Sequence, residues 1–191
     1  CREKSGVPGS AAAIEALAGL LKGRNHFAVS VSTDSRLLSA GRVVMPCGGV
    51  HKKQCAGGCR EVLEEVTEQD REALEDYCRQ LYCGQISGAE APGLGTCPKC
   101  GGPLVLNNVY AEHYNEEGYL AQWGLYTKWL QGTLNRRLLV LELGVGMQFP
   151  SVIRWPFEKI AFYNQKAGFY RVNGHLYQLT KELAGKGCGI S

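Results

Sequence analysis

Apolar and polar positions alternate in blocks along the chain, and the spacing within each block predicts a helix or a strand. Apolar residues three or four positions apart predict helices over 11–22, 35–40, 60–82, 116–131, 151–163 and 176–184. Shorter apolar runs, several with β-branched residues, predict strands over 27–32, 42–45, 104–106, 137–143 and 169–172. The strongest strand signal is Arg137–Leu143, whose nearly continuous apolar run is typical of a parallel strand covered on both faces.

A segment rich in Gly, Cys, Lys and His, residues 46–59, interrupts this regularity and shows no periodicity of its own. An acidic stretch follows, with eight acidic and two basic residues over 60–76. Residues 84–96 have the composition of a loop, and the tail 185–191 has that of a frayed end.

Strands and helices alternate on both sides of this cysteine-rich segment. The pattern predicts an α/β layer with a metal-binding module inserted into it. We expect residues 1–46 and 116–191 to form the α/β domain, and residues 47–115 to form the insert with its acidic helix.

Composition narrows the classes of protein to which this chain can belong. The net charge of +3 is small, and Lys52, Lys53 and Lys99 are too few basic residues beside the cysteines to favour nucleic acid. No apolar run approaches the roughly 18 residues that span a bilayer, and no secretory signal is evident. We therefore expect a cytoplasmic protein. Nine cysteines without such a signal favour metal binding over disulfides.

Four of the cysteines form two close pairs, Cys55-x3-Cys59 and Cys97-x2-Cys100, and each pair is followed or interrupted by glycines. Two thiol pairs in tight, glycine-rich turns are what a tetrahedral Zn²⁺ needs, with each sulfur about 2.3 Å from the metal. Four sulfurs fill the coordination sphere, so such a site is structural. The alternatives are thiols without metal, a redox CxxC pair, an iron–sulfur cluster, or a ligand role for Cys78 or Cys83.

The order of the surrounding motifs resembles that of a known family. A predicted strand ends in Ser32-Thr-Asp34, the two cysteine pairs follow, and an apolar strand then ends in Leu141-Glu-Leu-Gly-Val-Gly146. Pro150, Arg154-x-Pro-Phe157 and a strand ending in Val172-Asn173 complete the order. Over residues 18–184 the chain resembles the sirtuins, NAD-dependent protein deacylases, and looks most like their divergent bacterial branch, which includes protein ADP-ribosyltransferases.

The resemblance implies a partial Rossmann-like parallel sheet with an inserted zinc-ribbon module. It also implies NAD as cofactor and a protein as substrate or partner, and it leaves the oligomeric state open. By position, the implied cofactor-binding residues are Ser32, Asp34, Gly144, Val145, Gly146 and Asn173. Glycines let a backbone approach phosphate or ribose, and Asp or Asn can bond sugar hydroxyls. Taken without the family order, each of these residues is equally typical of a strand-end cap or a turn.

Several positions depart from the family pattern. The family's N-terminal Gly-Ala-Gly-x-Ser phosphate loop has no counterpart, and Ser32 replaces an Asn. Cys47 falls at the catalytic position, with His51 four residues later. A thiolate and a nearby His can act as nucleophile and base, but a loop cysteine and a solvated histidine fit the same sequence.

Two hypotheses follow. The chain is either a sirtuin-like transferase that is incomplete or catalytically degenerate as it stands, or a non-catalytic protein-interaction module stabilised by zinc.

Overall fold

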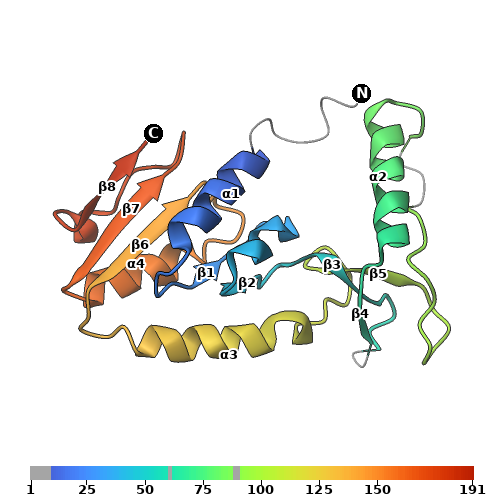
Figure 1. Ribbon diagram of the computed structural model, residues 1–191, viewed down its shortest axis with the longest axis horizontal. Helices are drawn as coiled ribbons and strands as arrows, with labels where there is room; N and C mark the ends of the chain where they lie inside the picture. The colour runs from blue at the N-terminus through green and yellow to red at the C-terminus, as the bar shows by residue number, and fades with distance from the viewer. Residues whose placement is uncertain (1–9, 60–61, 88–90) are drawn as a thin grey trace. The chain divides into compact units, whose positions relative to one another are not determined.

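The computed structural model describes residues 10–59, 62–87 and 91–191, and shows a mixed α/β protein with both parallel and antiparallel sheets (Figure 1). The chain divides into two compact units, Cys1–Ala121 and Gln122–Ser191. The boundary falls within helix α3 (Glu117–Gln131). None of the helices in the described part of the chain is both long and apolar enough to cross a membrane.

The first unit begins with a helix and a small parallel pair of strands, much as the apolar spacing predicts. Its elements are α1 (Ser10–Leu21), β1 (Ala28–Val29), the 3₁₀ helix η1 (Ser35–Ala40) and β2 (Val43–Val44). Strand β1 pairs with β2 and is shorter than predicted. It ends early because the Ser30 hydroxyl accepts a hydrogen bond from the Ser32 N–H, 3.2 Å away, and turns the chain.

A three-stranded antiparallel sheet occupies the middle of this unit, in the order β4-β3-β5. Its strands are β3 (Gly48–Cys55), β4 (Leu63–Glu65) and β5 (Leu104–Asn108). Most of residues 46–59 therefore form a strand, although the sequence of that segment shows no periodicity. Strand β3 does not show the apolar spacing of a strand because it buries two polar residues, Lys53 and Gln54. Their side chains form hydrogen bonds with residues far along the chain.

The acidic helix begins later than predicted. Helix α2 spans Glu68–Tyr82, and its first turn is closed by a capping box between Thr67 and Asp70. Residues 63–65, expected to be helical, pair with β3 instead, and residues 60–61 lie outside the described residues. Lys53 donates to Asp70 Oδ2 and to the Leu94 carbonyl, both at 2.9 Å, and so ties the strand to the start of the helix.

A buried amide network fixes the segment that follows β5. Gln54 Oε1 accepts from Asn107 Nδ2 at 2.6 Å and from the Asn115 N–H at 2.9 Å, while Gln54 Nε2 donates to the His113 carbonyl at 2.8 Å. Each of these polar groups has a partner, so burying them is not costly. The network holds residues 113–115 against the sheet.

The second unit is a three-stranded parallel sheet in the order β6-β7-β8, visible as neighbouring arrows in Figure 1. Its elements are β6 (Leu138–Leu143), α4 (Arg154–Tyr163), β7 (Ala167–Val172), the 3₁₀ helix η2 (Lys181–Leu183) and β8 (Gly187–Ile190). Val140, Ala161 and Phe169 form its core, so α4 covers one face. The alternate leucines 139, 141 and 143 are exposed, so the expectation of cover on both faces of β6 was wrong.

The C-terminal segment differs from prediction. Only residues 181–183 of the helix expected over 176–184 are helical, and the tail expected to fray forms β8 beside β7. The strand fits because a β-carbon at Gly187 would lie 1.6 Å from the Phe169 carbonyl oxygen, and one at Gly189 would lie 2.0 Å from that of Tyr177. Only glycine allows these approaches.

The parallel strands belong to two separate sheets, β1-β2 in the first unit and β6-β7-β8 in the second. A single Rossmann-like sheet and the division at residues 47 and 115 therefore stay predictions.

Candidate metal centre

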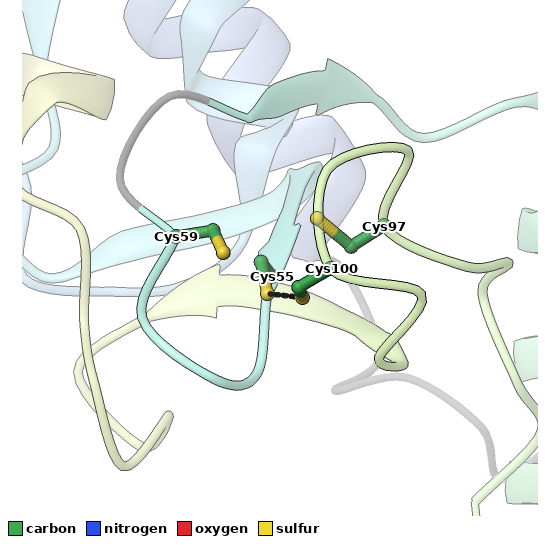
Figure 2. Close-up of side chains that lie close together, drawn as sticks. All are labelled: Cys55, Cys59, Cys97 and Cys100. Atoms are coloured by element: carbon green, nitrogen blue, oxygen red, sulfur yellow. Dashed lines mark hydrogen bonds between the residues drawn. The ribbon is translucent and has the colours of Figure 1, made fainter.

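Four cysteine side chains meet at one end of the antiparallel sheet (Figure 2). The sulfur atoms of Cys55, Cys59, Cys97 and Cys100 all lie within 4.8 Å of one another, and those of Cys55 and Cys100 are 3.4 Å apart. Sulfurs at the corners of a tetrahedron around Zn²⁺, each about 2.3 Å from the metal, would be about 3.8 Å apart. The cluster therefore matches the size of a tetrahedral four-thiolate site.

The first pair of sulfurs comes from a turn at the end of β3. Cys55 is the last residue of the strand, and the Gly58 N–H donates to its carbonyl at 3.3 Å. Gly58 has a φ of +76°, a conformation that side chains disfavour, so glycine is required for the chain to reverse here. The turn brings Cys59 back toward Cys55.

The second pair comes from a similar turn before β5. The Gly101 N–H donates to the Cys97 carbonyl at 2.8 Å, and the Cys97 N–H donates to the Gly102 carbonyl at 2.7 Å. Gly101 also has a positive φ, +71°. The Ala56 N–H donates to the Pro103 carbonyl at 3.0 Å, which joins the two turns directly.

Burial and electrostatics both favour a cation at this position. Cys55 and Cys97 are only 2% exposed and share a small core with Val62, Leu94 and Leu104. The backbone N–H of Cys59 lowers the pKa of the Cys55 thiol to about 7. The side-chain hydrogen bond between Cys59 and Cys100 raises the pKa of the Cys59 thiol to about 12. Cys55 therefore ionises readily, whereas its neighbours disfavour a second thiolate at Cys59. A bound divalent cation stabilises both thiolates.

The residues present can therefore hold a metal ion, and the donor set of four sulfurs is the one that zinc prefers. All four positions of a tetrahedron are taken by protein, so no position is left for water or substrate. Among the described residues, neither Cys78 nor Cys83 joins this cluster.

The candidate catalytic pair lies nearby in sequence but is not arranged as a nucleophile and its base. Cys47 is buried immediately before β3, and burial raises the pKa of its thiol. His51 lies within β3, and burial lowers its pKa. Its Nδ1 atom has no hydrogen-bond partner, and no hydrogen bond joins Cys47 to His51 in the described part of the chain. The neutral thiol is a poor nucleophile.

The candidate residues after β1 are engaged in local structure. The Asp34 N–H donates to Ser32 Oγ at 3.1 Å. The Asp34 carboxylate caps η1 by accepting from the Arg36 N–H at 3.0 Å, and it forms an ion pair with the Arg36 guanidinium. That ion pair lowers the pKa of Asp34.

The structure brings together the candidate residues of the second unit. The Gly144 N–H donates to the Val172 carbonyl at 2.8 Å, and Asn173 Nδ2 donates to the Val145 carbonyl at 3.0 Å. The glycine turn and Asn173 thus meet at the carboxyl ends of β6 and β7, where ligands bind in open α/β sheets. Nothing lies within 4 Å of a β-carbon placed at Gly144 or Gly146, so this backbone is open to a ligand.

A buried charge network beside this turn was missed from the sequence. Arg171 Nε and Nη2 donate to the two oxygens of Glu142 at 2.6 and 3.0 Å, and Nη2 also reaches Glu158 at 2.7 Å. Arg154 Nη2 approaches the same Glu142 at 3.3 Å. The available signal was Glu142 itself, an acid inside an otherwise apolar strand.

No protein-family model matches the chain. The chain is similar to a protein ADP-ribosyltransferase of Staphylococcus aureus (strain Mu50), with 27% identity over 89 residues. The match covers 46% of this chain and 28% of the relative, so the chain spans well under two thirds of that protein. The match supports an ADP-ribosyltransferase-like relationship.

Proposed function

We propose that this chain is an ADP-ribosyltransferase-like protein related to the sirtuins, whose fold depends on a structural zinc. The observation that carries the proposal is the similarity to the staphylococcal ADP-ribosyltransferase. The order of motifs along the sequence adds the sirtuin relationship. Of the two reactions in that family, the name of the relative favours transfer of ADP-ribose to a protein over deacylation.

The four-cysteine cluster supports the zinc part of this proposal. Two glycine turns joined by a hydrogen bond, beside a three-stranded antiparallel sheet, are what a zinc ribbon needs. A closed Cys₄ site does no chemistry. Its binding energy stabilises the fold instead.

The cofactor-binding proposal has partial support. The open glycine backbone at 144–146 can accept a ribose or phosphate. Asn173, however, already donates to Val145 and accepts from the N–H groups of His175 and Leu176 at 3.0 and 2.9 Å. The Asp34 carboxylate is likewise engaged by Arg36. We therefore propose that this chain as it stands binds NAD weakly or not at all.

A second candidate function is a non-catalytic interaction module stabilised by zinc. The state of Cys47 and His51 favours it, because a buried neutral thiol and an unpartnered neutral imidazole supply neither nucleophile nor oriented base.

Calorimetric titration with NAD tests the proposal. We expect no saturable binding below about 1 mM, an affinity worth about 4 kcal/mol. Gly146→Val is the matched variant, because it fills the open turn without requiring a positive φ. Micromolar binding by the wild-type chain would show that the degenerate form of the proposal is wrong. Loss of that binding in Gly146→Val would then assign the cofactor to the glycine turn.

A further inference from the structure

Arg154, the first residue of α4, is buried with part of its hydrogen-bonding capacity unused. It is only 9% exposed. Its Nη2 donates to the Leu176 carbonyl at 2.6 Å, and its Nη1 faces the thioether sulfur of Met147 at 3.7 Å, a weak acceptor. Its Nε is buried and has no acceptor among the described residues. A buried N–H without a partner is unusual and needs an explanation.

Arg154 is less closely paired with carboxylates than Arg171 is. Both neighbouring carboxylates bond more closely to Arg171: Glu142 at 2.6 Å and Glu158 at 2.7 Å, against 3.3 Å from Glu142 to Arg154. Arg171 Nη1 also donates to the Gln178 carbonyl at 2.7 Å. The side chain of Arg171 is therefore held by protein acceptors, and Arg154 is the arginine that is better able to pair with an added anion.

A pocket of about 380 Å³ lies against this arginine. Its walls include Met147, Arg154, Trp155, Glu158, Arg171 and Thr180. All of them belong to the second unit. The pocket, which Met147 also lines, therefore offers space beside Arg154, and Nη1, with only the weak sulfur acceptor of Met147, is the donor that a ligand oxygen would use.

The start of α4 places the positive end of a helix dipole beside Arg154. Ile153 stands at the N-cap in a helical conformation, and its side chain cannot accept from the first turn. The positive end of the helix dipole is thus not offset by a polar cap, and helix starts of this kind favour anions.

We propose that this pocket is an oxyanion subsite, in which a phosphate or carboxylate oxygen of a ligand accepts from Arg154. The subsite does not depend on the proposed ADP-ribosyltransferase relationship, since it rests only on the side chains of the second unit.

The test follows the Nε–H resonances of arginine in the ¹⁵N-labelled full chain. The chain is titrated with inorganic phosphate, and separately with acetate, at constant ionic strength up to about 20 mM, within the range of weak binding. Arg154→Lys keeps the charge and removes the guanidinium with its Nε and Nη donors. Arg137→Lys, at an exposed position before β6, is the matched control.

We expect one Nε–H resonance, assigned through bonds to Arg154, to shift and saturate with phosphate. Arg154→Lys should weaken binding at least about tenfold, and Arg137→Lys should leave it unchanged. Saturation by acetate alone also supports the subsite and identifies a carboxylate ligand. The proposal fails if neither anion shifts the Arg154 resonance, or if both variants weaken binding equally. If Arg154→Lys does not fold, the wild-type resonance still decides.

Discussion

At the scale of single residues, Lys53 shows how one buried cation organises its surroundings. Its ammonium donates to Asp70 Oδ2 and to the Leu94 carbonyl. These two hydrogen bonds join strand β3 to the start of helix α2 and to the loop that contains Leu94. Asp70 also accepts from the Thr67 N–H and hydroxyl, at 2.9 and 2.8 Å. These bonds, with the bond from Lys53 foremost, lower the pKa of Asp70 to about 2.

This carboxyl should make the stability depend on pH. The pKa of Asp70 in the folded chain is about 2, below the value of about 3.9 in an unfolded chain. Ionised Asp70 therefore stabilises the fold above about pH 4, and this contribution is lost as the pH falls toward 2. Urea unfolding of wild type and Asp70→Asn should show a gap at pH 7 that narrows between those values. A gap of constant size would contradict the assignment.

The two buried thiols, Cys97 and Cys47, should differ sharply when each is replaced by alanine. Cys97→Ala should lose the metal and destabilise the fold by more than about 3 kcal/mol. Cys47→Ala should keep the metal and cost about 1 kcal/mol. Zinc analysis of each freshly purified protein, together with denaturant unfolding, checks both values. Wild-type protein with less than about half an equivalent of zinc would argue against the structural site.

The sequence predicts the metal cluster well because each half of it is encoded locally. Each thiol pair lies in one turn, and glycines at 58 and 101 supply the turn geometry. The unpaired Nε of Arg154 and the burial of Cys47 could not be predicted in this way. They depend on residues far along the chain, such as Leu176 for Arg154, and local spacing does not encode those contacts.

At the scale of elements, the charge network joins β6, β7 and α4 through Glu142. Its side chain is only 1% exposed, and it accepts from both Arg171 and Arg154. Glu158, on α4, is more exposed and pairs with Arg171. One buried carboxylate thus links the side chains of Arg171 on β7 and Arg154 on α4, in addition to the backbone ladder that pairs β6 with β7.

Replacing the two acids should separate their contributions. Glu142→Gln leaves two buried guanidinium groups without their shared carboxylate and should destabilise the fold by about 3 kcal/mol. Glu158→Gln removes one partner near the surface and should cost about 1 kcal/mol. Thermal or urea unfolding measures both, and equal losses would mean that the network is not centred on Glu142.

Elements with regular apolar spacing could be predicted, and those held by buried polar contacts could not. The helices α1, η1 and α3 and the strands β6 and β7 lie close to their predicted positions. In contrast, β3 carries buried Lys53 and Gln54, and β8 is half glycine, so neither shows strand alternation. Their pairing partners, rather than their own composition, determine them.

At the scale of the whole molecule, the division into two units separates the metal cluster from the parallel sheet. All four cysteines lie in the first unit, and the three-stranded parallel sheet lies in the second. Each unit has its own core. The match to an ADP-ribosyltransferase agrees with the branch that the motif order predicts, whereas the sirtuin resemblance itself stays a prediction.

Removal of the metal should therefore affect the two units unequally. After chelation, amide hydrogens of β3 and β5 should exchange rapidly, while those of β6 and β7 should stay protected. Hydrogen exchange read by mass spectrometry measures this directly, and added zinc should restore the protection. Equal loss of protection in both units would show that they unfold together.

The close fit of β8 against its neighbours limits which residues related proteins can carry at two positions. Two glycines, Gly187 and Gly189, are the only residues that the neighbouring carbonyls admit, so mutation at either site removes the strand rather than adjusting it. Descendants of the same ancestor should keep both glycines or lose the strand altogether. This two-glycine signature identifies which of them retain a third strand, even where the rest of the sequence has drifted beyond recognition.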